Sequence, residues 1–538
     1  MNTPFLLDAV VLVAYFAVIV GIGLSQRSKS GSVEGFSLGD RQIPWWAVLT
    51  SILAAEISAA TFLGAPGEGF DKKNWTYAQL AIGTVIARVF VSFIFIPIYY
   101  RHGVISIYEF LETRFGNFTR KLASAIFLVT RVLAMGTRLY VSAIIVVLAV
   151  VMWRGGTAVT PGEKFALYAG ALVLVTLLTA LYTTIGGIRA VIWTDFIQVG
   201  VLVLALGFTV PFLFGKIDGG WATVSQHINA PAFIDTVPRT EGEGFGAWLA
   251  RMFSLEYTVY AAFIGSTFVT MATHGIDQDT VQRMLTAKNR RQSAVATVLS
   301  GLADLPIVAA FILIGVLLAV YYSVNPPADL PTEGREVFPY FILHEMSPGL
   351  RGLVTAGILA TAMGSLSTAL NALATSFARD FALPRLERGG ILVDEWQRVR
   401  VLRQSTVFFA VLIIIVGVIT AAYMAYNKDA RIIPLVLGIL GFTFGSLLGI
   451  FLLGLFTRNR GNDKGNAWAI AAGIIAVLWS SGAPHKLLPG LFEFLPGFTL
   501  AFPWRITLGT LVTFGVAACF TTPPDRIAVR DKADAATA

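Results

Sequence analysis

The stretch PWWAVLTSILAAEISAATFLGAPGEGF, residues 44–70, decides how the rest of the chain is interpreted. It is long enough to cross a bilayer, which takes about 20 mostly apolar residues. Glu56 lies at its centre, and a carboxylate at that depth should face protein or water because contact with lipid is costly. Ser58, Thr61 and the glycines after them favour a helix that breaks here and exposes carbonyl oxygens, as at many solute and ion sites. The alternative is a continuous, kinked helix with a buried, hydrogen-bonded Glu56.

The composition is that of a membrane protein with many spans. The chain has 538 residues, of which 56% are hydrophobic and 13% charged, and its mean hydropathy is +0.72. Soluble domains have about 25% charged residues. The single cysteine, Cys519, excludes an internal disulfide. Residues 5–24 have no basic segment before them and no cleavage motif after them, so we expect a retained first span.

Thirteen apolar runs predict an all-α integral membrane protein with about 13 transmembrane helices. The polar tail after Pro524 is expected to be disordered. The predicted spans are 6–25, 44–70, 77–100, 122–152, 163–185, 188–214, 252–274, 294–323, 349–378, 404–426, 432–457, 465–482 and 502–521.

Basic residues are distributed unevenly between the two sides of this arrangement. Of the 40 Lys and Arg, 24 fall in one set of loops and 13 in the other. The positive-inside rule then places the N-terminus outside and the C-terminus in the cytoplasm. The localisation predicted is a plasma membrane, such as the bacterial inner membrane. The remaining three arginines lie at membrane depth: Arg88, Arg131 and Arg138.

Span counting suggests an internal repeat. Spans two to six and seven to eleven form two groups of five, and an odd number of spans inverts the second group relative to the first. Both groups open with small and hydroxyl residues at mid-span, which is the best sequence indication of a transporter site. The predicted segments are 1–43 (an extra helix and inner loop), 44–214 (first repeat), 215–251 (outer loop), 252–457 (second repeat), 458–521 (two extra helices) and 522–538 (cytoplasmic tail).

Hydroxyl residues recur at helical spacing in the ninth predicted span. Thr361, Ser365, Thr368 and Thr375 share a face with small neighbours. This pattern suits either close helix packing or a site for a hard cation such as sodium, which prefers oxygen ligands. From the residues alone the two interpretations have about equal weight.

Two further carboxylates are predicted within the membrane. Asp195 lies two turns after the helix-breaking Gly186–Gly187 pair, and Asp304 lies in the eighth predicted span. An intramembrane carboxylate indicates ion binding or a structural ion pair. The three arginines at membrane depth have a simple structural explanation as partners of Glu56 or Asp304.

The seventh predicted span ends in the charge run HGIDQDTVQRMLTAKNRR. Asp277, Gln278, Gln282 and Arg283 are expected at the inner boundary of the membrane, and such a run is normally a solvated face.

The sequence offers little for an enzyme. It has no phosphate-binding Gly–Lys loop, no clustered His or Cys, and no Ser–His–Asp set that the topology would assemble. We therefore expect no catalytic residues, no organic cofactor and no nucleic-acid partner.

Five ordered motifs resemble the sodium:solute symporters, a family that includes sodium–glucose, sodium–proline, sodium–iodide, multivitamin and sialic-acid transporters. The resemblance implies sodium-driven symport of a small solute by alternating access, and the five-plus-five inverted-repeat fold of neurotransmitter:sodium symporters. The motifs lie within residues 36–381: FSLGDRQIPWWAVLTSILAAEISAATFLGAPGEGF, ISIYEFLETRFG, TTIGGIRAVIWTDFIQ, HGIDQDTVQRMLTAKN and GSLSTALNALATSFARDF.

The resemblance also implies site residues. Many members have Ser where this chain has Gly364, so one hydroxyl ligand of the core sodium site is missing. The implied core site comprises Ala54, Ile57, Thr361, Gly364 and Ser365; the second sodium site comprises Asp195, Ser367 and Thr368; the solute positions are Glu56, Ser58, Thr61, Gln79, Arg138, Thr270, Thr273 and Asp304.

The resemblance indicates the kind of solute less directly. Sugar-transporting members have an aromatic gate where this chain has Thr273 and a Lys where it has Asp304, whereas the sialic-acid type uses an Arg near Arg138 for the solute carboxylate. A carboxylate-bearing anion or zwitterion is favoured, and a sugar is the alternative. A channel or a sensor with a transporter fold is the alternative from another class.

Overall fold

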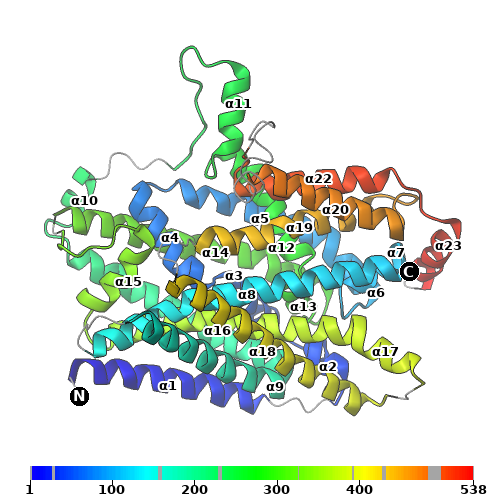
Figure 1. Cartoon of the computed structure of the whole chain (residues 1–538), viewed down its shortest axis with the longest axis horizontal. Coiled ribbons are helices and arrows are strands. Elements are labelled where there is room, and N and C mark those ends of the chain that lie inside the picture. Colours follow the sequence, from blue (N-terminus) through cyan, green and yellow to red (C-terminus); the bar gives the residue numbers. More distant parts are fainter. Residues whose placement is uncertain are drawn as a thin grey trace.

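The computed structural model describes residues 3–26, 31–154, 160–227, 233–324, 326–390, 393–426, 432–482 and 499–536. Within these ranges the chain is almost entirely helical and contains no β-strand (Figure 1). This agrees with the all-α expectation. In the first half the elements are α1 (Thr3–Ser25), α2 (Val33–Leu38), α3 (Trp45–Glu56), α4 (Ala59–Lys72), η2 (Thr76–Gln79), α5 (Leu80–Phe90), η3 (Val91–Phe95), α6 (Ile96–His102), α7 (Tyr108–Arg114), α8 (Asn117–Trp153), α9 (Pro161–Gly215) and α10 (Trp221–His227).

The second half continues the bundle with long apolar helices. The elements are α11 (Phe245–Ser254), η4 (Ala261–Gly265), α12 (Ser266–Gly275), α13 (Gln278–Met284), α14 (Arg290–Val324), α15 (Gly334–Glu345), α16 (Leu350–Phe377), η5 (Ala378–Ala382), α17 (Leu383–Arg388), α18 (Glu395–Tyr426), α19 (Ile432–Phe456), α20 (Asp463–Ser480), α22 (Phe502–Ala518) and α23 (Pro524–Ala536).

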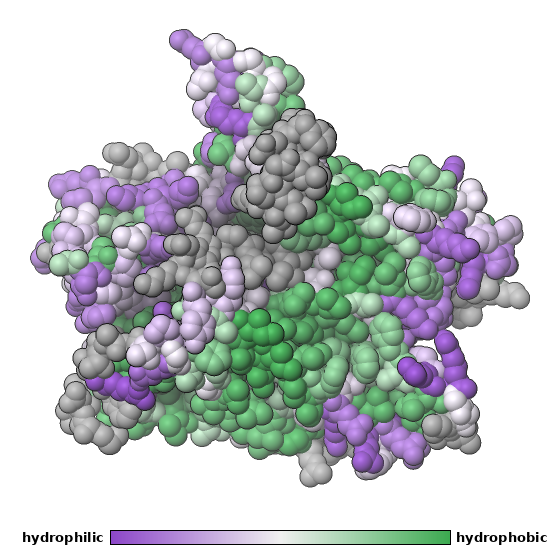
Figure 2. Space-filling model, in the orientation of Figure 1, coloured by the Kyte–Doolittle hydropathy of each residue, from purple (hydrophilic) through white to green (hydrophobic). Residues whose placement is uncertain are grey.

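Among the described residues, seven helical segments are long and apolar enough to cross a membrane, and the bent pair α3–α4 makes an eighth. Several shorter helices, such as α12, fall in the remaining predicted spans. The predicted number of thirteen spans therefore stays a prediction. Figure 2 shows an apolar band across the middle of the molecule with polar side chains beyond it. The N-terminus with α10 and α15 lies at one end, and the C-terminus with α7 and α23 lies at the other (Figure 1).

The helix that opens the first predicted repeat is broken, as the sequence predicted. α3 ends at Glu56, Ile57 and Ser58 are extended, and α4 begins at Ala59 with the Ser58 hydroxyl accepting a hydrogen bond from the Thr61 amide. The segments Trp45–Glu56 and Thr61–Lys72 are bent by 62°. The break removes the next turn of helix, so carbonyl oxygens at the end of α3 lose their usual N–H partners.

A second predicted break lies within α9. Gly187 has φ 59° and ψ −150°, a conformation that an L side chain rarely adopts. A Cβ atom at this position would also lie 2.6 Å from the Phe36 carbonyl oxygen. The backbone therefore requires glycine here, and the predicted spans 163–185 and 188–214 are two arms that meet at this kink.

α16 lies at the centre of the bundle and is buried along almost its whole length. It packs against α9, α8, α1 and α3. Its small residues allow this close approach. The helix that carries the predicted sodium ligands is therefore enclosed by other helices.

Two sequence expectations differ from the structure. The predicted span 252–274 includes the end of α11, which stops at Ser254; the helix resumes near Ala261. α11 belongs to a hairpin that projects from the body (Figure 1). The tail after Pro524 was expected to be disordered, and that was wrong: it forms α23, because its several Ala residues and its Arg and Lys residues have high helix propensity.

Candidate functional site

The broken helix opens onto a central cavity of about 310 Å³. The cavity brings together six of the predicted solute positions, Glu56, Thr61, Arg138, Thr270, Thr273 and Asp304, and also the predicted sodium ligand Ile57. The other lining residues, which were not predicted as solute ligands, are Ile52, Ala55, Tyr77, Leu80, Ala81, Thr84, Arg131, Ser266, Val269, His274, Asp277, Asp279, Thr280, Val308, Phe444, Phe502 and Pro503.

Glu56 is held by an arginine from the neighbouring span. Its carboxylate forms an ion pair with Arg88, which is fully buried in α5. The Arg88 Nε donates to His274 Nε2 of α12 at 3.3 Å. The predicted pairing of an intramembrane arginine with Glu56 is therefore present, and its partner is Arg88.

Arg131 is also neutralised. It forms an ion pair with Asp277, and its second partner is Asp279 at 3.3 Å. The sequence had suggested Glu56 or Asp304 as partners for this arginine, and neither of them pairs with it. The actual partners lie at the start of α13, a segment that the charge run alone would place at a solvated boundary. The structure buries it instead.

Arg138 differs from these two arginines. Its side chain lines the cavity, and no ion pair or hydrogen bond to its guanidinium occurs within the described part of the chain. Its Nε is buried without a hydrogen-bond partner. An unpaired guanidinium at membrane depth is costly, so a ligand carboxylate would be a favourable partner.

Asp304 lies across the same cavity on α14 and is 5% exposed. Its carboxylate forms no hydrogen bond or ion pair with any residue that the structure describes. Arg138 and Asp304 are thus a basic and an acidic group in one cavity, each open to a ligand.

Two predicted solute positions lie outside the cavity lining. The Gln79 side chain forms hydrogen bonds to the backbone on either side of α11: its Nε2 donates to the Tyr257 carbonyl at 2.9 Å, and its Oε1 accepts from the Asp235 amide at 3.4 Å. Ser58 is buried and caps α4. Both residues support the cavity walls in this conformation.

The predicted core sodium residues converge where α16 crosses the break. Ala54 and Ile57 share a small buried space with Thr361. A Cβ at Gly364 would lie 3.4 Å from the Ala54 carbonyl oxygen. The Ser365 hydroxyl donates to the Thr361 carbonyl at 2.9 Å, so it lies on the adjoining turn. The described geometry therefore brings this predicted set together.

Gln198 of α9 was not predicted and completes this space. It is 2% exposed, and both atoms of its side-chain amide lack hydrogen-bond partners among the described residues. Its Oε1 would lie 2.8 Å from a Cβ at Gly364. A buried amide without partners is costly. The available signal was its position one helical turn after Asp195, on the same face.

The second predicted sodium site is arranged differently. Asp195 is fully buried; its Oδ2 accepts from the Ser51 hydroxyl at 2.5 Å and lies 3.3 Å from Arg283, while its Oδ1 has no described partner. The hydroxyls of Ser367 and Thr368 donate to the Gly364 carbonyl, and no hydrogen bond joins them to Asp195 in the described residues.

Arg283 connects this site to the cavity. It pairs with Asp195 on one side and with Asp279 at 2.8 Å on the other. Asp279 also contacts Arg131. The sequence placed Arg283 at the inner boundary, but it is fully buried. The result is a row of alternating charges from the second sodium site to the cavity: Asp195, Arg283, Asp279, Arg131 and Asp277.

Comparison with known proteins identifies the class. The model of the sodium:solute symporter family matches residues 36–473, and the chain belongs to this family. The resemblance inferred from the five motifs is thereby confirmed.

Its relatives include two bacterial sialic acid symporters. The sodium/sialic acid symporter SiaT of Proteus mirabilis is 29% identical over 87% of this chain and 88% of its own length. NanT of Aliivibrio fischeri is 26% identical over 89% and 88%. The human sodium-coupled monocarboxylate transporter 2 is 26% identical over 88% of this chain and 72% of its own. The protein is thus a multi-pass membrane transporter that couples solute movement to sodium.

Solved structures share its fold. A substrate-bound, outward-open Na⁺-coupled sialic acid symporter superposes with a TM-score of 0.76 at 24% identity, covering 95% of this chain and 97% of its own. A nucleobase–cation symporter, Mhp1, gives 0.51 at 14% identity, covering 92% and 97%. The fold is that of Na⁺-coupled transporters.

Proposed function

We propose that the protein imports a carboxylate-bearing solute, an organic anion or zwitterion, together with sodium. The observation that carries this proposal is the pairing pattern of the three intramembrane arginines. Arg88 and Arg131 have carboxylate partners, whereas Arg138 faces the cavity without one. The planar guanidinium suits bidentate binding of a carboxylate.

Asp304 supports a solute with a second polar group. Its buried carboxylate can accept hydrogen bonds from a hydroxyl or an amine on the same molecule. The names of the relatives agree with this chemistry, because sialic acid and monocarboxylates both carry a carboxylate. A neutral sugar, the alternative, would leave the Arg138 charge without a partner.

The core sodium site is proposed to use Gln198. The family hydroxyl is absent at Gly364, and the Gln198 amide oxygen lies beside the position that such a side chain would occupy. Amide oxygens are good ligands for hard cations. We assign the core site to the carbonyls of Ala54, Ile57 and Thr361, the Ser365 hydroxyl and Gln198, and the second site to Asp195, Ser367 and Thr368.

The remaining elements of the proposal concern architecture. We infer thirteen spans with a five-plus-five inverted repeat, an external N-terminus and a cytoplasmic C-terminus in a bacterial inner membrane. The irregular helices that open the two halves, α3–α4 and η4–α12, support the repeat. The placement of the two termini at opposite ends in Figure 1 supports an odd number of spans, and the excess of basic residues in one set of loops supports the orientation.

Uptake into proteoliposomes tests the proposal. An inward sodium gradient should drive accumulation of a radiolabelled sialic acid or a short monocarboxylate, and a neutral hexose should neither accumulate nor compete. Full uptake driven by a pH gradient in sodium-free buffer would contradict the ion assignment. Accumulation of the hexose alone would restore the sugar alternative.

A further inference from the structure

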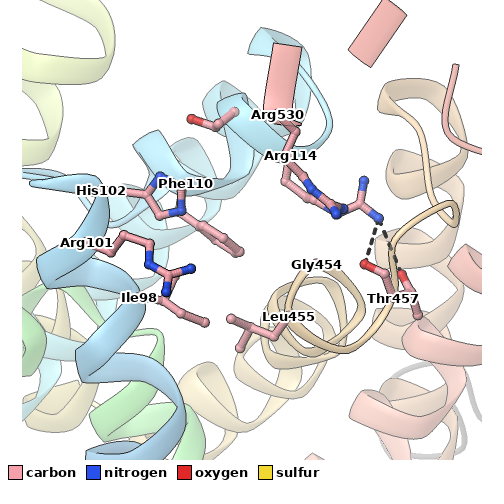
Figure 3. A pocket seen from close by; sticks show the side chains of 10 residues that line it. Ile98, Arg101, His102, Phe110, Arg114, Gly454, Leu455, Thr457 and Arg530 are labelled. Carbon is pink, nitrogen blue, oxygen red and sulfur yellow. Dashed lines mark hydrogen bonds between the residues drawn. The ribbon is translucent and has the colours of Figure 1, made fainter. Parts of the chain in front are cut away.

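A second pocket, of about 190 Å³, lies away from the transport cavity, at the end of the bundle that carries the C-terminus. It is formed by α6, α7, α19 and α23 and the residues that follow α19 (Figure 3). Three arginines line it, Arg101, Arg114 and Arg530, together with His102. Among the described residues, no carboxylate is part of its lining.

Arg114 is the buried anchor of this pocket. It is 2% exposed, and its terminal nitrogens donate to the carbonyls of Thr457 (3.0 Å) and Arg460 (3.1 Å) and to the Thr522 hydroxyl (3.3 Å). All of these partners are neutral, and its Nε has no described partner. Burial and the nearby Arg530 lower the pKa of Arg114 to about 10. The described partners thus leave its charge uncompensated.

Arg101 approaches the pocket from the opposite wall. It lies near the end of the span Thr76–His102, is exposed, and forms no ion pair within the described ranges. Figure 3 shows its guanidinium pointing toward the space between α6 and α19. The same space has an apolar side made by Ile98, Phe110 and Leu455.

We propose that this pocket binds a phosphate-bearing anion between Arg101 and Arg114. Guanidinium groups bind phosphate through parallel, charge-assisted hydrogen bonds. The apolar side and the position at the end of a span fit the head group and glycerol region of an anionic phospholipid, since basic pockets at the cytoplasmic side of membrane helices bind such head groups. A soluble phosphate compound is the other source of the same chemistry.

Thermal unfolding of the purified full-length protein tests the proposal. The protein is delipidated in a neutral detergent and titrated with phosphatidylglycerol, with phosphatidylcholine, or with inorganic phosphate without lipid. Phosphatidylglycerol should raise the unfolding midpoint and phosphatidylcholine should not, because a ligand that binds the folded state stabilises it. Arg101→Gln should remove most of this shift.

The matched control is Arg388→Gln, an exposed arginine at the end of α17 outside the pocket. It should keep the full shift. Arg114→Lys is a second probe. It keeps the positive charge but loses the planar guanidinium, so it should weaken the shift of the unfolding midpoint. Arg101 is the better position for the main test, because Arg114 also forms structural hydrogen bonds.

The lipid and phosphate arms identify the source. If inorganic phosphate alone raises the midpoint and Arg101→Gln removes that effect, the phosphate site stands and its ligand is soluble. If the phosphatidylglycerol shift is the same in Arg101→Gln as in the unmodified protein, the proposal is overturned. Equal losses in Arg101→Gln and Arg388→Gln would also overturn it, because the effect would then be general surface charge.

Discussion

Glu56, at the end of α3, forms its ion pair with Arg88 of α5, and this pairing leaves Arg138 facing the cavity without a carboxylate in the described part of the chain. The sequence alone allowed Arg138 to be the structural partner of Glu56. Because Arg88 already occupies that role, the free guanidinium points to a ligand.

Arg138→Lys should weaken solute binding while the protein still folds. The substitution keeps the charge but loses the bidentate geometry, so affinity should fall by about 1–3 kcal/mol. Equilibrium binding of the identified solute at saturating sodium measures this. Arg154→Lys, at the exposed residue that directly follows the same helix, is the control. Unchanged affinity in Arg138→Lys would assign Arg138 to the scaffold and favour a neutral sugar.

Asp195→Asn and Ser365→Ala should each raise the sodium concentration needed for half-maximal uptake. Loss of one ligand among buried polar groups costs on the order of 1–3 kcal/mol. The sodium dependence of uptake at fixed solute concentration measures the effect, with the exposed Asp218→Asn as control. If the sodium dependence of uptake in both variants equals that of the unmodified protein, neither residue is a sodium ligand.

Gly364→Ser and Gln198→Ala should show coupled effects on sodium affinity. A Cβ at position 364 would approach Gln198 Oε1 to 2.8 Å, and the amide end can move because it has no described hydrogen-bond partner. Gly364→Ser should therefore tighten sodium binding or leave it unchanged. Gln198→Ala should weaken binding strongly alone and less in the Gly364→Ser background. Additive effects in this double-mutant cycle would show that the two residues do not share one site.

The ion pair between Lys216 and Glu345 should give a stability term that depends on pH. The Lys216 ammonium donates to the Glu345 carboxylate at 2.6 Å, and this hydrogen bond lowers the pKa of Glu345. A lowered pKa means that the stabilisation is present above the unfolded pKa and is lost as the pH falls through the folded value. Lys216→Met should thus lower the unfolding midpoint at pH 7, and this effect should shrink as the pH falls from the ordinary carboxyl range through the lowered pKa of Glu345. An effect that does not change between neutral pH and a pH at which Glu345 is protonated in the folded state would exclude the ion pair as its cause.

Reporters fused to the C-terminus should show that it lies in the cytoplasm. The excess of basic residues in one set of loops supports this orientation. A fluorescent protein that folds only in the cytoplasm should therefore fluoresce, and alkaline phosphatase at the same position should be inactive. The reverse result would contradict the predicted orientation: either the whole bundle is inverted, or it has one span more or fewer than thirteen.

The sequence was sufficient for features that depend on local chemistry. The break after Glu56 follows from small and hydroxyl residues beside a carboxylate, and the kink at Gly187 follows from a conformation that requires glycine. Both could be predicted because the residues that cause them are adjacent in the chain.

Features that depend on distant partners were not available from the sequence. Arg283 was expected at a boundary, yet it is buried because Asp195, 88 residues away in the chain, and Asp279 compensate its charge. The space beside Gly364 is likewise occupied by the side chain of Gln198, which belongs to another helix. The end of α11 near Ser254 was missed because its apolar residues continue the hydropathy of the next span.

The row of alternating charges has a consequence for how the membrane voltage acts on the transporter. With all groups ionised, Asp195, Asp279 and Asp277 exceed Arg283 and Arg131 by one negative charge. The Glu56–Arg88 ion pair adds no net charge, and the opposite charges of Arg138 and Asp304, which do not pair with each other, also cancel in the sum. Two sodium ions and one monoanionic solute would make this set neutral. A charge that crosses the whole membrane changes in energy by about 2.3 kcal/mol per 100 mV. An interior-negative potential should therefore act mainly on the empty carrier and drive its negatively charged interior back toward the outward-facing state.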